Sequence, residues 1–294
     1  EHLLIASTHA TILCFSDLGK VYWLKVFHIP LASRNARGRP MVNLLPLDEG
    51  ERITSILPVE GYEEGHFIFM ATARGIVKKT DMQQFARQRS VGLRALELEE
   101  DDWLVGTAVT DGSCDVMLLS SEGKAVRFQE QAVRAMGRTA RGVRGIKLGD
   151  EHRLISLIVP QTESTILTVS EKGYGKRTDT AEFPCKGRGT KGVIAMATTA
   201  KNGPLVGAVQ VSAGDEIMLI SDQGTAVRTR VEEISTLGRN TQGVRVIKTR
   251  EDEKLVRLSR IVEDDDAVPD AELAESVASP EPEVSPASDD TGES

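Results

Sequence analysis

The chain has 294 residues, of which 40% are hydrophobic and 27% are charged, so it is able to bury a core over most of its length. No run approaches the roughly 18 consecutive apolar residues of a membrane span. Residues 1–10 lack the basic and apolar regions of a signal peptide. Because the chain does not begin with Met, we expect it to be part of a longer protein.

The three cysteines, Cys14, Cys114 and Cys185, lie far apart in the sequence, and no C-x-x-C pair occurs. The five histidines are scattered. This usage argues against a disulfide framework and against a zinc site. It predicts small buried side chains in a reducing cytoplasm.

The formal net charge of −8 is distributed unevenly along the chain. Residues 263–294 hold 12 of the 44 acidic residues, four prolines and no Lys, Arg or aromatic residue. Without them, 36 basic and 32 acidic residues remain, which is a net charge of +4 for residues 1–262. A segment of such composition does not bury enough apolar surface to fold. The sequence therefore predicts a folded domain over residues 1–262 and a disordered acidic tail over residues 263–294.

Five segments share one design: an apolar run, a short polar turn with one glycine, and a second, alternating run. They are TILCFSDLGKVYWLKV (11–26), FIFMATARGIVKKT (67–80), VMLLSSEGKAVRFQ (116–129), ILTVSEKGYGKRTD (166–179) and IMLISDQGTAVRTR (217–230). The shared positions, which we call the hairpin glycines, are Gly19, Gly75, Gly123, Gly173 and Gly224. The pattern predicts five β-hairpins whose tight turns need a positive φ at that glycine.

A second glycine follows each hairpin glycine by 19, 17, 19, 19 and 19 residues. These second glycines are Gly38, Gly92, Gly142, Gly192 and Gly243. An apolar run then closes each unit, at 53–59, 104–110, 154–160, 205–211 and 255–262. A period of about fifty residues, with only short helical turns expected at 82–88 and 230–236, predicts β-blades around an axis. Residues 3–9 look like the closing run of a preceding unit, so we expect five whole repeats and the end of another.

Basic residues recur at fixed places in the repeat. Four places after the hairpin glycine come Lys79, Arg127, Arg177 and Arg228. Four places before the second glycine come Arg34, Arg138, Arg188 and Arg239. Directly before it come Arg37, Arg141 and Lys191, and two places after it come Arg94, Arg144 and Arg245. Arginine suits bidentate phosphate contacts and glycine permits close backbone approach, so the repeated loops predict a polyanionic ligand.

Acidic residues recur elsewhere, in the turns before the closing runs, at 48–51, 99–102, 150–151 and 251–253. Because the signs are separated in each repeat, we expect one basic and one acidic rim. Few aromatic residues accompany the basic loops, which favours contacts with the phosphates of duplex DNA over stacking on single-stranded bases. One alternative stays open, in which the charges only solubilise a propeller-like scaffold for protein partners. Steeply salt-dependent DNA binding separates the two.

Several of these stretches together resemble one family. SRNARGRPMVNLLPL (33–47), AVRAMGRTARGVRGIKL (132–148), GYGKRT (173–178), TKGVIAM (190–196) and GRNTQGV (238–244) are similar to the C-terminal domain of gyrase A, a component of bacterial DNA gyrase. The resemblance spans about residues 1–262. The related domain of topoisomerase IV is an alternative, although it is shorter and more degenerate.

The resemblance implies an all-β fold, the β-pinwheel, a propeller-like disc of four-stranded blades that exchange strands with their neighbours. It implies a non-catalytic domain that wraps duplex DNA around a basic perimeter, so that gyrase introduces negative supercoils. The implied partners are duplex DNA, the rest of gyrase A, and gyrase B in an A2B2 assembly, in the bacterial cytoplasm and not at a membrane. The gyrase A box, Q-R-R-G-G-K-G, is absent, and by register we expect it ahead of Glu1. Its most similar loop here is KGRGTKG (186–192).

The sequence predicts no catalytic residue, metal or cofactor. No Walker loop occurs. The acidic residues Asp48, Glu49 and Glu51 lack EF-hand spacing, and Tyr174 is expected to be a packing residue. The predicted DNA contacts are Arg34, Arg37, Arg39, Lys79, Arg87, Arg89, Arg94, Arg127, Arg138, Arg141, Arg144, Arg177, Lys186, Arg188, Lys191, Arg228, Arg239 and Arg245.

Overall fold

The computed structural model describes residues 6–31, 39–250 and 252–261. In these ranges it contains β-strands and short 3-10 helices and no α-helix, which confirms the all-β prediction. None of its helices is long and apolar enough to cross a membrane, as far as these residues go. The predicted acidic tail, residues 263–294, and the predicted contacts Arg34 and Arg37 lie outside the described residues.

Within the described ranges, nineteen strands form five antiparallel sheets, which are the predicted blades. Blade 1 consists, in spatial order, of β3 (Ile53–Val59), β1 (Thr11–Ser16), β2 (Lys20–Lys25) and β6 (Leu93–Arg94). Blade 2 consists of β7 (Leu104–Thr110), β4 (Phe67–Thr72), β5 (Ile76–Asp81) and β10 (Val143–Arg144). Blade 3 consists of β11 (Leu154–Ile158), β8 (Asp115–Ser120), β9 (Lys124–Gln129) and β14 (Val193–Ile194). Blade 4 consists of β15 (Leu205–Val211), β12 (Thr165–Ser170), β13 (Tyr174–Asp179) and β18 (Val244–Arg245).

Blade 5 has three strands among the residues that the structure describes. They are β19 (Leu255–Ile261), β16 (Glu216–Ser221) and β17 (Ala226–Arg230). The 3-10 helices are η1 (Val26–His28), η2 (Met41–Asn43), η3 (Met82–Phe85), η4 (Glu130–Ala132), η5 (Thr180–Glu182) and η6 (Val231–Glu233). Two of them, η3 and η6, confirm the expected helical turns. Residues 6–10 form a turn and no strand, so the closing strand expected over 3–9 is not seen in its described part.

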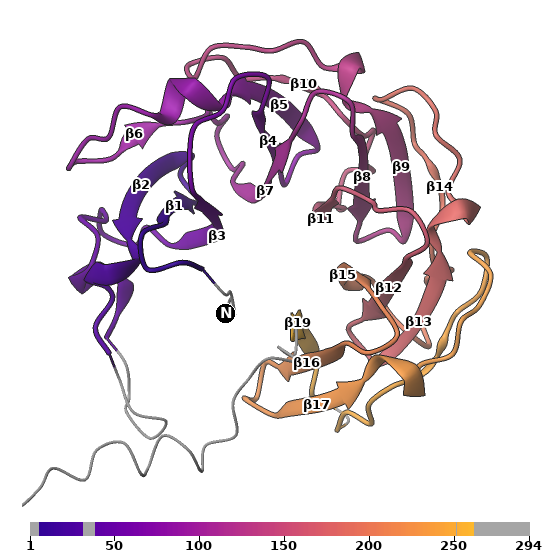
Figure 1. Ribbon diagram of the computed structural model, residues 1–294. Coiled ribbons are helices and arrows are strands. Elements are labelled where there is room, and N and C mark those ends of the chain that lie inside the picture. Colours follow the sequence, from indigo (N-terminus) through magenta and orange to yellow (C-terminus); the bar gives the residue numbers. More distant parts are fainter. Residues whose placement is uncertain (1–5, 32–38, 251, 262–294) are drawn as a thin grey trace, which may run out of the picture. The chain divides into compact units, whose positions relative to one another are not determined.

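The fourth strand of blades 1 to 4 comes from the next repeat along the chain. In blade 3, for example, β14 pairs with β9, with Val193 opposite Ala125. The closing strands β3, β7, β11, β15 and β19 contact one another in this order around a common axis, while the exchanged strands lie on the outer side (Figure 1). Strand exchange between neighbouring blades is the feature that distinguishes a pinwheel from a simple propeller.

The hairpin glycines have the positive φ that the turns need, between 72° and 83°. At the first four, the next repeat adds a second constraint. The Gly123 carbonyl accepts hydrogen bonds from the backbone N–H of Ala195 (2.8 Å) and of Met196 (3.1 Å). A Cβ on Gly123 would lie 2.2 Å from the carbonyl oxygen of Met196, so a larger residue does not fit.

The second glycines that the structure describes permit the strand exchange, whereas Gly38 lies outside the described residues. Gly92, Gly142, Gly192 and Gly243 all have positive φ, between 75° and 105°. A Cβ on Gly192 would lie 2.2 Å from the carbonyl oxygen of Ala125 in the preceding blade. The close approach expected at these positions therefore exists, but at three of the four the partner is the backbone of the preceding blade, and at Gly92 it is the ring of Tyr22.

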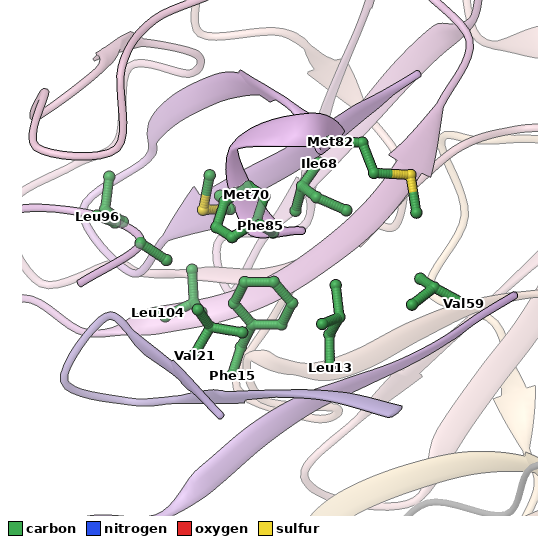
Figure 2. Packing of buried hydrophobic residues seen from close by; sticks show 11 residues of the cluster. Leu13, Phe15, Val21, Val59, Ile68, Met70, Met82, Phe85, Leu96 and Leu104 are labelled. Carbon is green, nitrogen blue, oxygen red and sulfur yellow. The ribbon is translucent and has the colours of Figure 1, made fainter. Parts of the chain in front are cut away.

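The hydrophobic core lies mainly between blades. Figure 2 shows the cluster between blades 1 and 2, where Leu13 and Phe15 of β1 face Ile68 of β4 and Phe85 of η3. The Phe15 and Phe85 rings meet edge to face, with centroids 6.1 Å apart. Similar clusters fill the next three junctions. Because a single blade does not bury its faces alone, each repeat needs its neighbours.

Candidate nucleic-acid interface

The segments that carry the exchanged strands are held along the neighbouring blade before they pair with it. We call residues 86–94, 134–144, 184–194 and 235–245 the exchanged segments. The backbone N–H of Met136, Lys186 and Leu237 donates to the carbonyl of Lys79, Arg127 and Arg177, each at 2.8 Å. In each case the acceptor lies four places after a hairpin glycine, and the donor lies six places before the second glycine of the next repeat.

Exposed basic side chains gather on the exchanged segments. The exposed members of the predicted contact set are Arg39, Arg87, Arg89, Arg94, Arg141, Arg144, Lys186, Lys191, Arg228 and Arg245. Eight of these ten lie on the four exchanged segments, and the exceptions are Arg39 and Arg228. Since those segments form the outer side of successive blades, strand exchange places positive charge on the perimeter.

Arg188 and Arg239, four places before their second glycines, are half-buried and join neighbouring exchanged segments. Arg188 donates from Nε to the carbonyl of Ala132 (2.9 Å) and from Nη1 to that of Arg144 (3.0 Å). Arg239 donates from Nη1 to the carbonyl of Ile194 (3.2 Å). Arg144 and Ile194 occupy the same place in their repeats, so the exchanged segments 134–144, 184–194 and 235–245 form a continuous band.

Two of the basic residues four places after a hairpin glycine, Lys79 and Arg127, form contacts inside the protein. Lys79 is 5% exposed, and its Nζ lies 3.3 Å from Oε2 of the buried Glu130. Arg127 donates to Asp115 (2.8 Å) and to the carbonyl of Thr180 (3.0 Å). The contacts with Glu130 and Thr180 fasten a blade to the 3-10 helix of the next repeat. They leave Lys79 and Arg127 few hydrogen-bond donors for a ligand. The position of these residues in the repeat did not indicate this structural role.

Arg177 and Arg228 hold the same place in blades 4 and 5. Arg177 Nε donates to the carbonyl of Ile234, just after η6, at 2.7 Å. Arg228 instead pairs with Glu216 of its own blade. The same residue type therefore contacts the next repeat in blade 4 and a residue of its own blade in blade 5.

The two signs of charge are not as separate as their spacing in the sequence suggested. Arg141 Nη2 lies 3.5 Å from Glu97 Oε1, and its Nη1 lies 4.0 Å from Glu99 Oε1. Glu99 also lies 3.6 Å from Arg74 in the hairpin turn. Strand exchange thus carries a basic residue of one repeat to the acidic turn of the preceding one.

Tyr174 contacts Arg245, one of the predicted DNA contacts, and the sequence did not indicate this contact. The ring is 7% exposed, as expected of a packing residue. Its hydroxyl accepts a hydrogen bond from Arg245 Nη2 at 2.9 Å, and the guanidinium carbon lies 5.2 Å from the ring centroid. The hydrogen bond from Arg245 lowers the pKa of Tyr174. Both contacts restrict where the Arg245 side chain points.

One group of side chains in the described ranges has the geometry of metal ligands. Ligand atoms of Asp111, Cys114 and Glu130 lie within 4.8 Å of one another. However, Glu130 already accepts hydrogen bonds from the Thr110 hydroxyl (2.8 Å) and the Cys114 backbone N–H (3.0 Å). With its ion pair to Lys79 as well, this carboxylate is satisfied by the protein.

Comparisons with known proteins agree with this architecture. A family model described as DNA gyrase C-terminal domain, beta-propeller, matches residues 10–60, 66–111, 115–161, 164–212 and 215–261. These five stretches coincide with the five repeats. Solved structures are similar too. The DNA gyrase A C-terminal domain has a TM-score of 0.75 at 25% identity, covering 87% of this chain and 84% of that one. The C-terminal domain of DNA topoisomerase IV, with a TM-score of 0.79 at 24% identity over 86% of this chain and 80% of that one, supports the fold alone.

Curated relatives are more similar in sequence. The DNA gyrase A protein of Salmonella typhimurium is 57% identical over 287 residues, which cover 97% of this chain and 33% of the relative. The DNA gyrase A protein of Escherichia coli (strain K12) is 56% identical over 263 residues, which cover 90% and 30%. The chain thus spans about a third of the length of these relatives. With five matched repeats that exchange strands as the fold requires, the chain belongs to the DNA gyrase C-terminal domain family.

Proposed function

We propose that this domain binds duplex DNA along the exposed basic residues of its exchanged segments and bends the DNA around its perimeter. The observation that carries the proposal is the placement of eight exposed Arg and Lys residues on the outer side of blades 1 to 4. Arginine forks and lysine ammonium groups pair with phosphates, which lie on the outside of any duplex sequence. Binding is therefore sequence-tolerant.

Wrapping follows from the arrangement of the blades. Successive blades turn about one axis, and each presents its own basic segment, so a duplex that contacts several of them follows a curved path. The band formed by Arg188 and Arg239 fixes the spacing between these segments. The energy of bending is offset by the additional phosphate contacts.

Within the larger enzyme, we assign this domain a non-catalytic role in a bacterial gyrase, an ATP-dependent type II topoisomerase of the cytoplasm and its nucleoid. Its partners are then the rest of gyrase A and, through it, gyrase B, and the wrap gives strand passage the direction that produces negative supercoils. The support is the match to gyrase A proteins over nearly the whole chain. We retain the division into a DNA-wrapping domain, residues 1–262, and an acidic tail, residues 263–294, as part of the same proposal.

A topology experiment tests wrapping directly. Nicked circular DNA is ligated in the presence of the protein, and the linking number of the product is measured after the protein is removed. A shift of one sign that grows with protein concentration supports chiral wrapping. An unchanged linking number contradicts wrapping and leaves only binding or smooth bending.

Salt dependence distinguishes DNA binding from a scaffold for protein partners. With one or two phosphate contacts per basic loop, about five to ten contacts give a log–log salt slope of about −4 to −9. A slope near zero, or no binding at about 50 mM salt, would favour the scaffold.

A further inference from the structure

Two lysines lie fully buried beneath exchanged segments. Lys78 of β5 has no exposed surface, and its Nζ donates to the carbonyl of Ala95 (2.7 Å) and to that of Arg138. Ala95 follows the strand exchanged onto blade 1, and Arg138 precedes the strand exchanged onto blade 2. One ammonium group therefore joins the residue directly after the exchanged segment 86–94 to the exchanged segment 134–144.

Lys176 of β13 repeats the arrangement in blade 4. Its side chain is fully buried, and its Nζ donates to the carbonyl of Gly238 (2.6 Å), to that of Arg239 and to the Thr241 hydroxyl (3.1 Å). Both lysines stand three places after a hairpin glycine, and both bind the carbonyl four places before the second glycine. The match extends from the position on the strand to the atom that is bound.

Neither ammonium group forms an ion pair with a carboxylate in the part of the chain that the structure describes. Burial, together with the positive charge of Arg138, lowers the pKa of Lys78 to about 8. Burial lowers the pKa of Lys176 to about 8 as well; Glu182 acts to raise it and Arg239 to lower it. Burying an ammonium group whose hydrogen-bond acceptors are all uncharged oxygens is unfavourable. The two buried lysines are therefore expected to have a role beyond packing.

Folding alone does not supply that reason, because blade 3 forms without such a lysine. Its equivalent residue is Val126, which is 2% exposed. A Cβ added to Gly192 of the exchanged segment would lie 2.8 Å from Cγ2 of Val126. That exchanged segment is rich in glycine, in KGRGTKG, whereas those above Lys78 and Lys176 have fewer glycines. An apolar residue is thus sufficient for strand exchange, and the two lysines act on the conformation of the segments above them.

We propose that Lys78 and Lys176 are positioning residues for DNA binding, which draw the backbone of their exchanged segments inward and so hold Arg144 and Arg245 outward toward phosphates. The inference rests on the proposed function. Arg144 and Arg245 are exposed and follow the bound carbonyls by six residues each. The lysines themselves are out of reach of a ligand, so they act only through the segments.

A double-mutant cycle in the 294-residue chain tests this assignment. Lys78→Met keeps the length and apolar stem of the side chain but removes the ammonium group. Alone, it is expected to weaken binding to a duplex about five- to tenfold at low salt and to reduce the salt slope by about 1. Combined with Arg144→Ala, it should add little further loss, because the residue that it positions is already gone.

The second lysine provides the matched control. Lys78→Met combined with Arg245→Ala, in a different blade, should show independent losses of DNA affinity that multiply. Lys176→Met should add little loss to Arg245→Ala, and its loss should multiply with that of Arg144→Ala. If the losses of DNA affinity multiply for every combination of a lysine variant with an arginine variant, the lysines are merely structural and the inference is overturned. The proposal of DNA binding then still stands. If the unaltered chain does not bind DNA in a salt-dependent manner, both proposals are overturned.

A pH profile of the unaltered chain gives a readout that does not depend on a variant folding. Because the pKa of both lysines is lowered to about 8, the charged ammonium form decreases from pH 7 to pH 9, and the hydrogen bonds to the carbonyls weaken as the positive charge is lost. DNA affinity is expected to fall severalfold over that interval, since the exposed arginines stay charged throughout. A flat profile from about pH 7 to 9, together with losses that multiply in the double-mutant cycles, overturns the inference.

Discussion

Blades 4 and 5 are built from hairpins of the same design, yet only blade 4 receives a strand from a following repeat among the described residues. In β13 of blade 4, four of the six residues are buried. In β17 of blade 5, none of the five is buried. The hairpin motif thus determines the strands, whereas burial of the second strand comes from the exchange.

The same contrast appears at the hairpin glycines. Gly173 and Gly224 have φ of 77° and 83°. The Gly173 carbonyl accepts the N–H of Val246 (2.9 Å) and of Ile247 (3.2 Å), and a Cβ there would lie 2.3 Å from the Ile247 carbonyl oxygen. A Cβ on Gly224 would meet nothing within 4 Å among the described residues. Turn geometry requires both glycines, and the exchange constrains only the first.

The largest expected effect comes from replacing these two glycines by alanine. Gly173→Ala combines an unfavourable φ with a clash against the exchanged backbone and is expected to lower the free energy of unfolding by about 3 kcal/mol or more. Gly224→Ala carries only the φ penalty, about 1 kcal/mol. Urea unfolding of the two variants measures the difference. Equal losses would mean that the exchange does not constrain Gly173.

A smaller effect is expected at the matched arginines. Arg177→Ala removes a charged donor from the Ile234 carbonyl at the junction with the next repeat, for an expected loss of about 2 kcal/mol. Arg228→Ala removes the ion pair of an exposed side chain with Glu216, which is worth less than about 1 kcal/mol. Urea unfolding measures both. If Arg177→Ala leaves stability unchanged but weakens DNA binding, Arg177 is a ligand contact rather than a junction residue.

The exchanged strands themselves are tested by removing their exposed arginines. Arg144→Ala combined with Arg245→Ala is expected to weaken DNA binding at all sequences alike and to make the salt slope shallower by about 2. The free energy of unfolding should change by less than about 0.5 kcal/mol for Arg144→Ala, which lies on the surface. Arg74→Ala is the control, because Arg74 is exposed but lies in a hairpin turn beside Glu99. An equal effect of the control on the slope would contradict a role for the exchanged strands.

The smallest effect concerns a contact that blade 5 keeps within itself. Glu253 accepts hydrogen bonds from the Ser221 hydroxyl (2.6 Å) and the Arg250 backbone N–H (3.2 Å), and such bonds, that from Ser221 first, lower its pKa to about 2. A lowered carboxyl pKa stabilises the fold above the unfolded value near 4.5, and this stabilisation is lost as the pH falls toward 2.

The variant Glu253→Gln should therefore unfold at a lower urea concentration than the unaltered chain at neutral pH. The gap should close as the pH is lowered from about 5 toward 2. A gap that stays constant with pH would show that the carboxylate charge does not contribute. The Glu253 contacts involve no exchanged strand. A stabilisation measured for them would therefore show that the closing turn of a blade is stable without its neighbour.

Much of the fold was predictable because its signals are local. The hairpin turns and the short helical turns depend on residues close together in the sequence, and the period depends on the repetition of these local signals. The structure confirmed all three. The partner of each segment is not local, since it depends on which blade receives the strand. Lys79 and Arg127 shared a phase and a charge with surface residues, yet contacts with the next repeat draw them inside. The repeated phase alone does not indicate which way a side chain points.

The exchange of strands has a consequence for how such domains change in length over evolution. Each repeat donates one strand backward and accepts one from ahead, so removing or duplicating a whole repeat rejoins a donor with an acceptor. Among the described residues, β17 of blade 5 is the second hairpin strand that receives no exchanged strand. An insertion of part of a repeat, in contrast, would leave every later donor out of phase. Gene variation in this architecture is therefore expected to come in whole multiples of about fifty residues.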